Sequence, residues 1–169
     1  IEIPIPSNQS TFTIKAKIKA TSGYNSLFSP TYNQAYGHYY LWGATDGMGV
    51  WAGDARRANV MPESFDDWID VEYSYDGSTI TNKVNGVSAT YSFSGMRTSS
   101  IMTVFARYAG GYDKGHYKLK ELSATIGSKS FNFVPVRNRY TNDIGLLDPT
   151  TLTLYTNVST GEIVAGDPI

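Results

Sequence analysis

The segment that decides the fold class of this chain is Trp68-Ile-Asp-Val-Glu-Tyr-Ser-Tyr-Asp-Gly77. Apolar and polar side chains alternate along it, which is the period of an extended strand with one buried face. The polar residues between the apolar ones then face outward, and Asp76-Gly77 closes the strand in a tight turn. We expect the apolar set to face a core: Ile69, Val71, Tyr73 and Tyr75.

Strands with the same signature flank this segment on both sides. Residues 79–84 read as a short strand, Asn85-Gly86 as a second tight turn and residues 88–93 as the returning strand, so this region forms a meander. Residues 11–20 also alternate strictly, with apolar side chains on one face and Thr13 and three lysines on the other. We interpret that lysine stripe as a solvated outer face that guards against aggregation.

The rest of the chain adds further short strands and no long amphipathic helix. Gly, Pro, Asn or Asp interrupts the sequence every few residues, and strand-like runs cover residues 101–107, 116–126, 128–132, 152–155 and 163–165. Many short antiparallel strands pack most simply as two sheets, with a closed barrel as the alternative. The sequence therefore predicts an all-β, two-sheet antiparallel β-sandwich.

Composition limits the function classes. The 169 residues fit a single domain, 1–169, and because the first residue is Ile1 we expect this domain to be excised from a larger protein. A net charge of −1 offers no field for nucleic acid or an anionic membrane, and no apolar run is long enough for a transmembrane helix. We therefore expect no nucleic-acid partner and no membrane insertion. The absence of cysteine excludes disulfides, thiolate catalysis and cysteine-based metal sites.

Two groups of segments carry a resemblance to a known family. In the first, Trp68 opens a strand that leads to the Asp76-Gly77 turn and then to Val84-Asn85-Gly86. The second group consists of FNFVPVR at 131–137, GLLD at 145–148, LYTN at 154–157 and GEIVAG at 161–166. Together they resemble the concanavalin A-like jelly rolls, and in particular the laminin-G-like domains of phage tail and bacterial surface proteins.

The resemblance covers much of the chain after Trp68, whereas residues 21–60 match only in general character. It implies a two-sheet jelly roll that commonly binds sugars without catalysis. The implied partner is a polysaccharide or cell-surface glycan, and the implied location is extracellular, on a virion tail or a bacterial cell surface. A homo-oligomer, or contacts with neighbouring domains of the parent protein, stays open.

Aromatic side chains between Tyr24 and Trp51 are the main signal for a ligand. This region holds eight of them, interleaved with Asn, Gln, His and Gly. A core strand needs rings on one face only, and flat exposed rings suit the apolar faces of pyranose sugars. We predict that Tyr36, Tyr39 and Trp42 stack on sugar rings. Packing of the same rings against the core is the alternative.

A second aromatic loop, residues 107–116, has the same chemistry. We predict that Tyr108 and Tyr112 stack on the sugar, and that the two aromatic regions form the walls of one shallow site. The polar partners of the sugar hydroxyls would be Arg107, Asp113 and His116.

Carboxylates raise the question of catalysis. Laminarinase-type glucanases of the same fold place three carboxylates at alternate positions of one strand, whereas here Trp68 stands where the first would be and only Asp70 and Glu72 remain. A displacement mechanism would need a third group from elsewhere, so we predict no catalytic residues.

Calcium is the one cofactor that the sequence leaves open. Asp46, Asp54 and Asp113 lie in Gly-rich loops, where carboxylates and carbonyls could hold this ion. Ordinary turn residues are the alternative interpretation of these three.

The function predicted from the sequence is a non-catalytic glycan-binding module of a phage tail or bacterial surface protein. A structural assembly module without sugar binding and a glycosidase-related domain remain as alternatives.

Overall fold

The structure is a computed structural model that describes residues 1–20, 25–31, 36–41, 47–53, 55–105 and 117–157. Within these ranges every regular element is a β-strand, and all strand pairs are antiparallel. The smaller sheet runs in the order β1 (Glu2–Pro4), β10 (Ile101–Val104), β3 (Asn25–Ser29), β4 (Tyr36–Leu41), β5 (Met48–Ala52) and β6 (Ala55–Val60). The larger sheet runs in the order β14 (Thr153–Thr156), β13 (Ile144–Asp148), β12 (Lys129–Arg137), β11 (Tyr117–Ile126), β2 (Phe12–Ala20), β7 (Ile69–Tyr75), β8 (Thr79–Val84) and β9 (Val87–Ser92).

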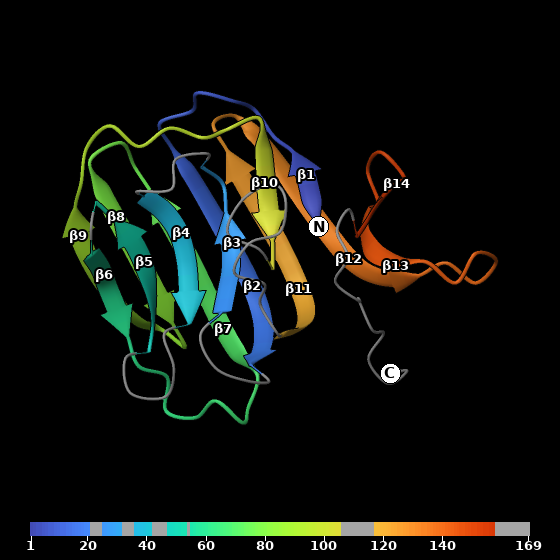
Figure 1. The fold of residues 1–169 in the computed structure, drawn as a ribbon, viewed down its shortest axis with the longest axis horizontal. Helices are drawn as coiled ribbons and strands as arrows, with labels where there is room; N and C mark the ends of the chain where they lie inside the picture. The colour runs from blue at the N-terminus through green and yellow to red at the C-terminus, as the bar shows by residue number, and fades with distance from the viewer. Residues whose placement is uncertain (21–24, 32–35, 42–46, 54, 106–116, 158–169) are drawn as a thin grey trace.

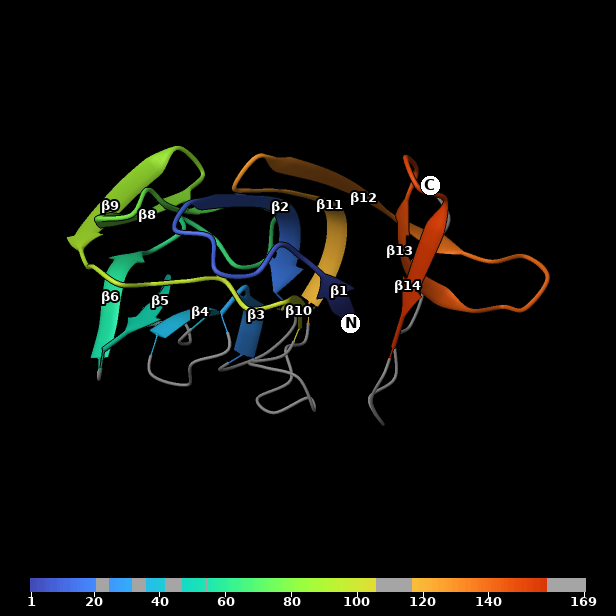
Figure 2. The ribbon, with the colours of Figure 1, turned by 90° about the horizontal axis from the view of Figure 1, so that it is seen from above.

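The two sheets lie face to face as a sandwich. Figure 1 looks through both layers, and Figure 2 shows β9, β8, β2 and β11 in one layer above β6, β5, β4 and β3 in the other. Each sheet keeps its own two edges, so the closed barrel is wrong and the predicted antiparallel sandwich is confirmed. None of the described residues belongs to a helix that could cross a membrane.

Alternation in β2 and β7 works as the sequence predicts. Ile69, Val71, Tyr73 and Tyr75 are buried, and so are the apolar residues of β2 up to Ile18. The strand β8 has the predicted bounds, and the turn at Asn85-Gly86 carries the positive φ angles that a two-residue hairpin requires, 47° and 88°. Burial of these faces removes apolar surface from water and is the main term that stabilises the sandwich.

Aromatic rings join the two sheets across the core. Phe28 and Tyr39 come from the smaller sheet, and their ring centroids lie 6.1 Å apart. Tyr39 in turn stacks on Tyr73 of the larger sheet at 5.5 Å, and Tyr73 meets Phe12 edge-on at 5.0 Å. These spacings fall within the range of favourable aromatic pairs, so the rings hold the layers in a fixed alignment.

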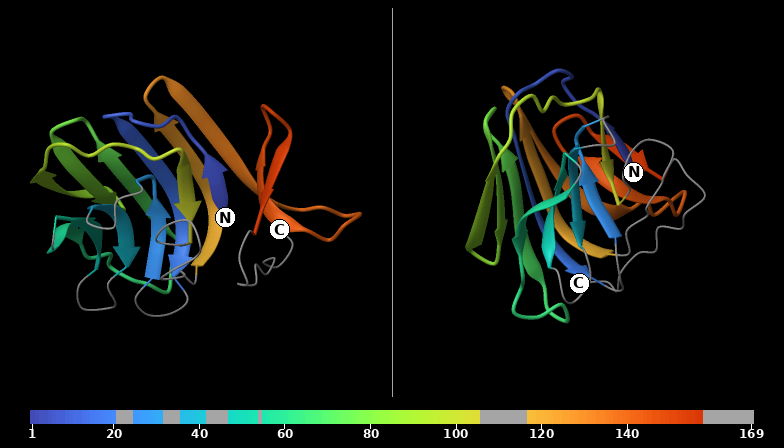
Figure 3. Two further views of the ribbon diagram at one scale, coloured as in Figure 1. Left: turned by 45° about the horizontal axis from the view of Figure 1, so that its top comes forward. Right: turned by 60° about the vertical axis from the view of Figure 1, so that its left-hand side comes forward.

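The strand β12 is shared between two pairings. Its first part, Lys129 to Phe133, pairs with β11, and its second part, Val134 to Arg137, pairs with β13. Figures 1 and 3 show β13 and β14 standing beside the body of the sandwich, with the β12–β13 turn reaching furthest from it. We call β13, β14 and the second part of β12 the C-terminal ribbon.

Candidate functional site

The outer face of the larger sheet carries a continuous row of charged side chains. It arises because alternation puts Lys15 and Lys17 of β2 outward, where the strand register sets them opposite Glu72 and Asp70 of β7. On the other side of β2, Glu121 of β11 lies opposite Lys17. The predicted lysine stripe is therefore one column of a larger charged surface.

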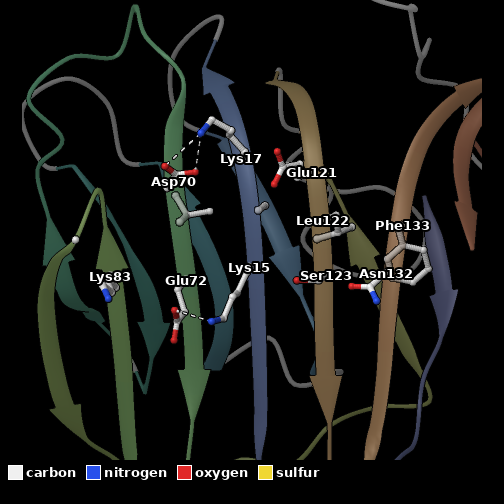
Figure 4. A pocket seen from close by; sticks show the side chains of 13 residues that line it. Lys15, Lys17, Asp70, Glu72, Lys83, Glu121, Leu122, Ser123, Asn132 and Phe133 are labelled. Carbon is white, nitrogen blue, oxygen red and sulfur yellow. Dashed lines mark hydrogen bonds and ion pairs between the residues drawn. The ribbon is translucent and has the colours of Figure 1, made fainter.

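These side chains surround a shallow groove of about 520 Å³ (Figure 4). Two hairpins, β8–β9 and β11–β12, bound it on either side of β2 and β7. The polar residues that line it are Lys15, Lys17, Asp70, Glu72, Lys83, Glu121, Ser123 and Asn132. We call this surface the ionic groove.

Two ion pairs cross the floor of the ionic groove. Lys15 Nζ lies 3.2 Å from Glu72 Oε2, and Lys17 Nζ lies 3.2 Å from Asp70 Oδ1 and 3.4 Å from Asp70 Oδ2. All four side chains are partly or largely exposed, so water screens the pairs and each contributes little to stability. Their effect is to fix four charged side chains on an open surface.

The charges of the ionic groove alternate in sign from strand to strand. Lys83 on β8 and Glu121 on β11 stand at the two sides, and among the described residues neither forms an ion pair. Positive and negative side chains are equal in number, so the groove offers both hydrogen-bond donors and acceptors without a net field.

Glu121 is the third carboxylate on this face, and the sequence reasoning missed it because strand order brings it there. Lys17 lies between Asp70 and Glu121 in the register and holds Asp70 in an ion pair.

The prediction that Tyr39 stacks on a sugar is wrong. Its side chain is 0% exposed, and its hydroxyl donates a 2.6 Å hydrogen bond to Asn82 Oδ1 inside the core. Burial raises the pKa of the Tyr39 hydroxyl well above its usual value, as expected for a phenol without water. Tyr39 and Tyr40 are adjacent on β4, and it is Tyr39 that faces inward.

The backbone of Tyr36 lies at the start of β4. It pairs with Ala52 at the beginning of β4, whereas Trp42 follows Leu41 at the opposite end of that strand. Six residues of extended chain span about 17 Å, so β4 does not by itself bring Tyr36 and Trp42 into one wall. The remaining predicted residues lie outside the described ranges: Trp42, Arg107, Tyr108, Tyr112, Asp113 and His116.

Strand pairing nevertheless collects the anchors of these segments at one end of the sandwich. Leu41, which precedes residues 42–46, pairs with Asn25 and with Met48. The segment 106–116 leaves after Phe105, whose amide donates to Leu27 O, and returns at Tyr117 opposite Ala20. The rings of Phe105 and Tyr117 stack at 5.8 Å and thereby close the base of that segment.

An exposed tryptophan marks the same end. Trp68 directly precedes β7, whose first residue Ile69 pairs with Ile18, and its side chain is 40% exposed. It stands two residues, or about 7 Å of extended chain, before Asp70 of the ionic groove. We call this end, with Trp68 and the Phe105–Tyr117 pair, the aromatic end.

The described residues neither support nor contradict the predicted calcium site. Asp46, Asp54 and Asp113, the predicted calcium ligands, lie outside the described ranges. Among the side chains that the structure does place, no group of three or more His, Asp or Glu is arranged to hold a metal ion.

Comparisons with known proteins bear on the fold. No protein-family model matches the chain, and no curated protein sequence matches it. Domains LG4-5 of the mouse laminin alpha1 chain superpose with a TM-score of 0.57 and 16% identity, over 73% of this chain and 38% of that one. Domain 4 of AbnA, a GH43 extracellular arabinanase from Geobacillus stearothermophilus in complex with arabinotriose, superposes with a TM-score of 0.52 and 15% identity, over 75% of this chain and 66% of that one.

These similarities establish the architecture. The chain spans about two fifths of the laminin domain pair and just under two thirds of the arabinanase domain. The two-sheet sandwich is therefore a laminin-G-like, concanavalin A-like jelly roll, as the resemblance of the sequence implies.

Proposed function

We propose that this jelly-roll domain is a non-catalytic glycan-binding module of a phage tail or bacterial surface protein, acting outside the cell. Its ligand would occupy the aromatic end and extend onto the adjoining ionic groove. The observation that carries the proposal is the exposed Trp68 ring, which lies at the end of the sandwich where the chain leads into Trp42 and into the predicted aromatic loop 107–116.

Chemistry supports a sugar at this place. An exposed indole ring offers a flat apolar surface for a pyranose, and the nearby lysines and carboxylates offer donors and acceptors for its hydroxyls. Domain 4 of AbnA, which has the same fold, was solved in complex with arabinotriose, and this supports a saccharide as the ligand. Asp70 and Glu72, the two carboxylates of β7 on this face, each form an ion pair with a lysine of β2.

A glycan-binding screen with two matched variants tests the proposal. The wild-type chain is applied to immobilised bacterial polysaccharides and oligosaccharides, and affinity for each hit is then measured by calorimetry. We expect Trp68→Ala and Tyr112→Ala to weaken binding at least tenfold, since a lost aromatic contact of this kind costs about 1.4 kcal/mol or more. Tyr140→Ala is the control, because Tyr140 is 88% exposed in the turn between β12 and β13, away from the aromatic end.

Three outcomes would contradict parts of the proposal. An empty screen at high protein concentration would leave the assembly module as the better description. Equal binding by the wild type, Trp68→Ala and Tyr112→Ala would remove the ligand from the aromatic end. Sustained release of reducing ends from a β-glucan would show that the domain is catalytic.

We also propose that Asp46, Asp54 and Asp113 bind calcium. A rise in Tm on adding the ion would support this proposal.

A further inference from the structure

The four edges of the two sheets differ in how they are protected against pairing with another chain. The strand β1 has three residues and carries Glu2 and Pro4, and β14 has four residues. In β6 two arginines, a bulge opposite Gly49 and a positive φ of 51° at Ala58 interrupt the edge. Short strands, charges, proline and bulges are the usual means by which proteins block edge-to-edge pairing.

The fourth edge, β9, has none of these. Its six residues, VSATYS, include no charge and no proline, and its pairing with β8 runs from Val87 to Ser92 without a shift in register. The nearest cation described on its inner side is Arg57 of β6, whose guanidinium lies 4.7 Å over the Tyr91 ring and thus contacts a side chain of β9.

The turn geometry determines which backbone groups of β9 are free. In a two-residue hairpin the pair next to the turn, Val84 and Val87, exchanges hydrogen bonds, and every second pair after it does the same. The 2.8 Å hydrogen bond from Phe93 N to Ser78 O continues this alternation. Ser88, Thr90 and Ser92 therefore point their amides and carbonyls away from β8, and within the described structure no further strand meets them.

We propose that β9 is a self-association edge, which pairs antiparallel with β9 of a second copy of this chain around a two-fold axis at Thr90. In that register Thr90 faces Thr90, and Ser88 faces Ser92 of the second copy. Each facing pair exchanges two backbone hydrogen bonds. The two larger sheets become one continuous sheet.

Side chains on both faces of this joint are self-complementary. On the outer face, Ser88, Thr90 and Ser92 bring hydroxyls opposite hydroxyls, so no like charges meet. On the inner face, Val87, which is 62% exposed, lies opposite Phe93 of the second copy and is covered by it. The first charged side chain along the sheet from the axis is Lys83 of β8, which lies opposite Ser88 and not opposite another lysine.

Light scattering over a concentration series tests this inference. We expect the mass of the wild-type chain to rise from 18.6 kDa towards twice that value between about 1 µM and 1 mM. Thr90→Lys places two ammonium groups beside each other on the axis and should weaken association at least tenfold. Thr90→Pro should do the same, because it removes an amide that makes no bond to β8.

Thr81→Lys is the matched control. Thr81 pairs with Thr90 on the same outer face, one strand inside the edge, so the same new charge there should leave association unchanged. Amide hydrogen exchange should in addition show protection of Ser88, Thr90 and Ser92 that increases with protein concentration. A wild type that stays monomeric at 1 mM would overturn the inference. So would a dimer that forms equally in both Thr90 variants, or one whose protected amides lie elsewhere. None of these measurements involves a glycan, so they are independent of the proposed function.

Discussion

Tyr39 of the smaller sheet and Asn82 of the larger sheet are joined by a buried hydrogen bond of 2.6 Å between Tyr39 Oη and Asn82 Oδ1. The Asn82 amide uses its two protons as well, and it donates to Met48 O and to Ala58 O at 2.8 Å each. One side chain thus ties three strands of the opposite sheet to β8. Because every polar group in this cluster is paired, the cluster aligns the layers without the cost of an unmade hydrogen bond.

Replacing Asn82 by leucine should therefore destabilise the domain strongly. The change removes the acceptor of the buried Tyr39 hydroxyl and the donors to Met48 O and Ala58 O, and we expect a loss of about 3 kcal/mol in the free energy of unfolding by urea. Tyr39→Phe removes one bond only and should cost about 1 kcal/mol. The exposed Thr90→Ala serves as control and should change stability by less than about 0.5 kcal/mol. Equal effects of Asn82→Leu and Thr90→Ala would show that the cluster is not a structural tie.

Alkaline titration should reveal the buried tyrosines. Burial raises the pKa of both Tyr39 and Tyr73 well above 10.0, so in the folded state they stay protonated where an unfolded tyrosine would ionise. Their contribution to stability is full below about pH 10 and declines as the pH rises above that value. Absorbance at 295 nm should show most of the 13 tyrosines ionising first, with the last ones ionising together with the loss of circular dichroism. Reversible ionisation of all of them in the folded chain would contradict the buried pair.

Lowering the pH should destabilise the fold through Asp76, whereas the buried tyrosines destabilise it when the pH rises. The backbone amides of Ser78 and Thr79 donate to Asp76 Oδ1 and lower the pKa of this carboxyl. Its contribution is present above the unfolded value near pH 4 and is lost as the pH falls through the lower folded value. We expect Asp76→Asn to lower Tm at pH 7 and to have no effect at the lowest pH. A Tm difference that stays constant over the whole range would contradict this account.

Neutralising the ion pairs of the ionic groove should leave the fold intact. Asp70→Asn and Glu72→Gln each remove one exposed pair, for which we expect a change of less than about 1 kcal/mol in the free energy of unfolding. High salt should reduce even that difference. A larger loss in either variant would mean that these residues support the sheet as well as line the groove.

Two glycines allow the cost of a steric clash to be separated from the cost of a positive φ angle. Gly47 and Gly86 both have positive φ, at 72° and 88°. A Cβ on Gly47 would collide with the Val60 carbonyl, whereas a Cβ on Gly86 would meet no described atom within 4 Å. Gly86→Ala should therefore cost about 1 kcal/mol and Gly47→Ala clearly more. Equal losses in chemical denaturation would show that the contact with Val60 relaxes freely.

Strands whose apolar and polar residues alternate regularly could be predicted from the sequence. Strands in which a bulge interrupts this alternation could not. The strands β2, β7 and β8 alternate without a break, and the predictions for them hold. By contrast, the pairings β3–β4, β4–β5 and β5–β6 each contain a register shift, which breaks the alternation on which the prediction depends. The four described strands of the region 21–60, β3 to β6, could not be predicted for this reason. In β13 the run IGLLD has no alternation to detect.

Site prediction was limited by the same physics. Nothing in the sequence distinguishes Tyr39 as a core residue among the neighbouring aromatics, and only the packing of the sheets shows that its ring is buried. Asn82 could have been noticed, because it is a polar residue at an inward position between Ile80 and Val84. The ionic groove could not, since it depends on β11 lying next to β2, far apart in the sequence.

The shared strand β12 divides the domain into parts of unequal resistance to unfolding. If β13 and β14 detach, residues 129–133 remain paired with β11. Leu146 is the one buried core hydrophobic described in these two strands, so its burial and the ring contact of Phe133 with Tyr155 are the main apolar losses. We therefore expect partial opening to begin in the C-terminal ribbon. A protease present at low concentration should cut first in the turn between Arg137 and Ile144 and leave the rest of the jelly roll folded.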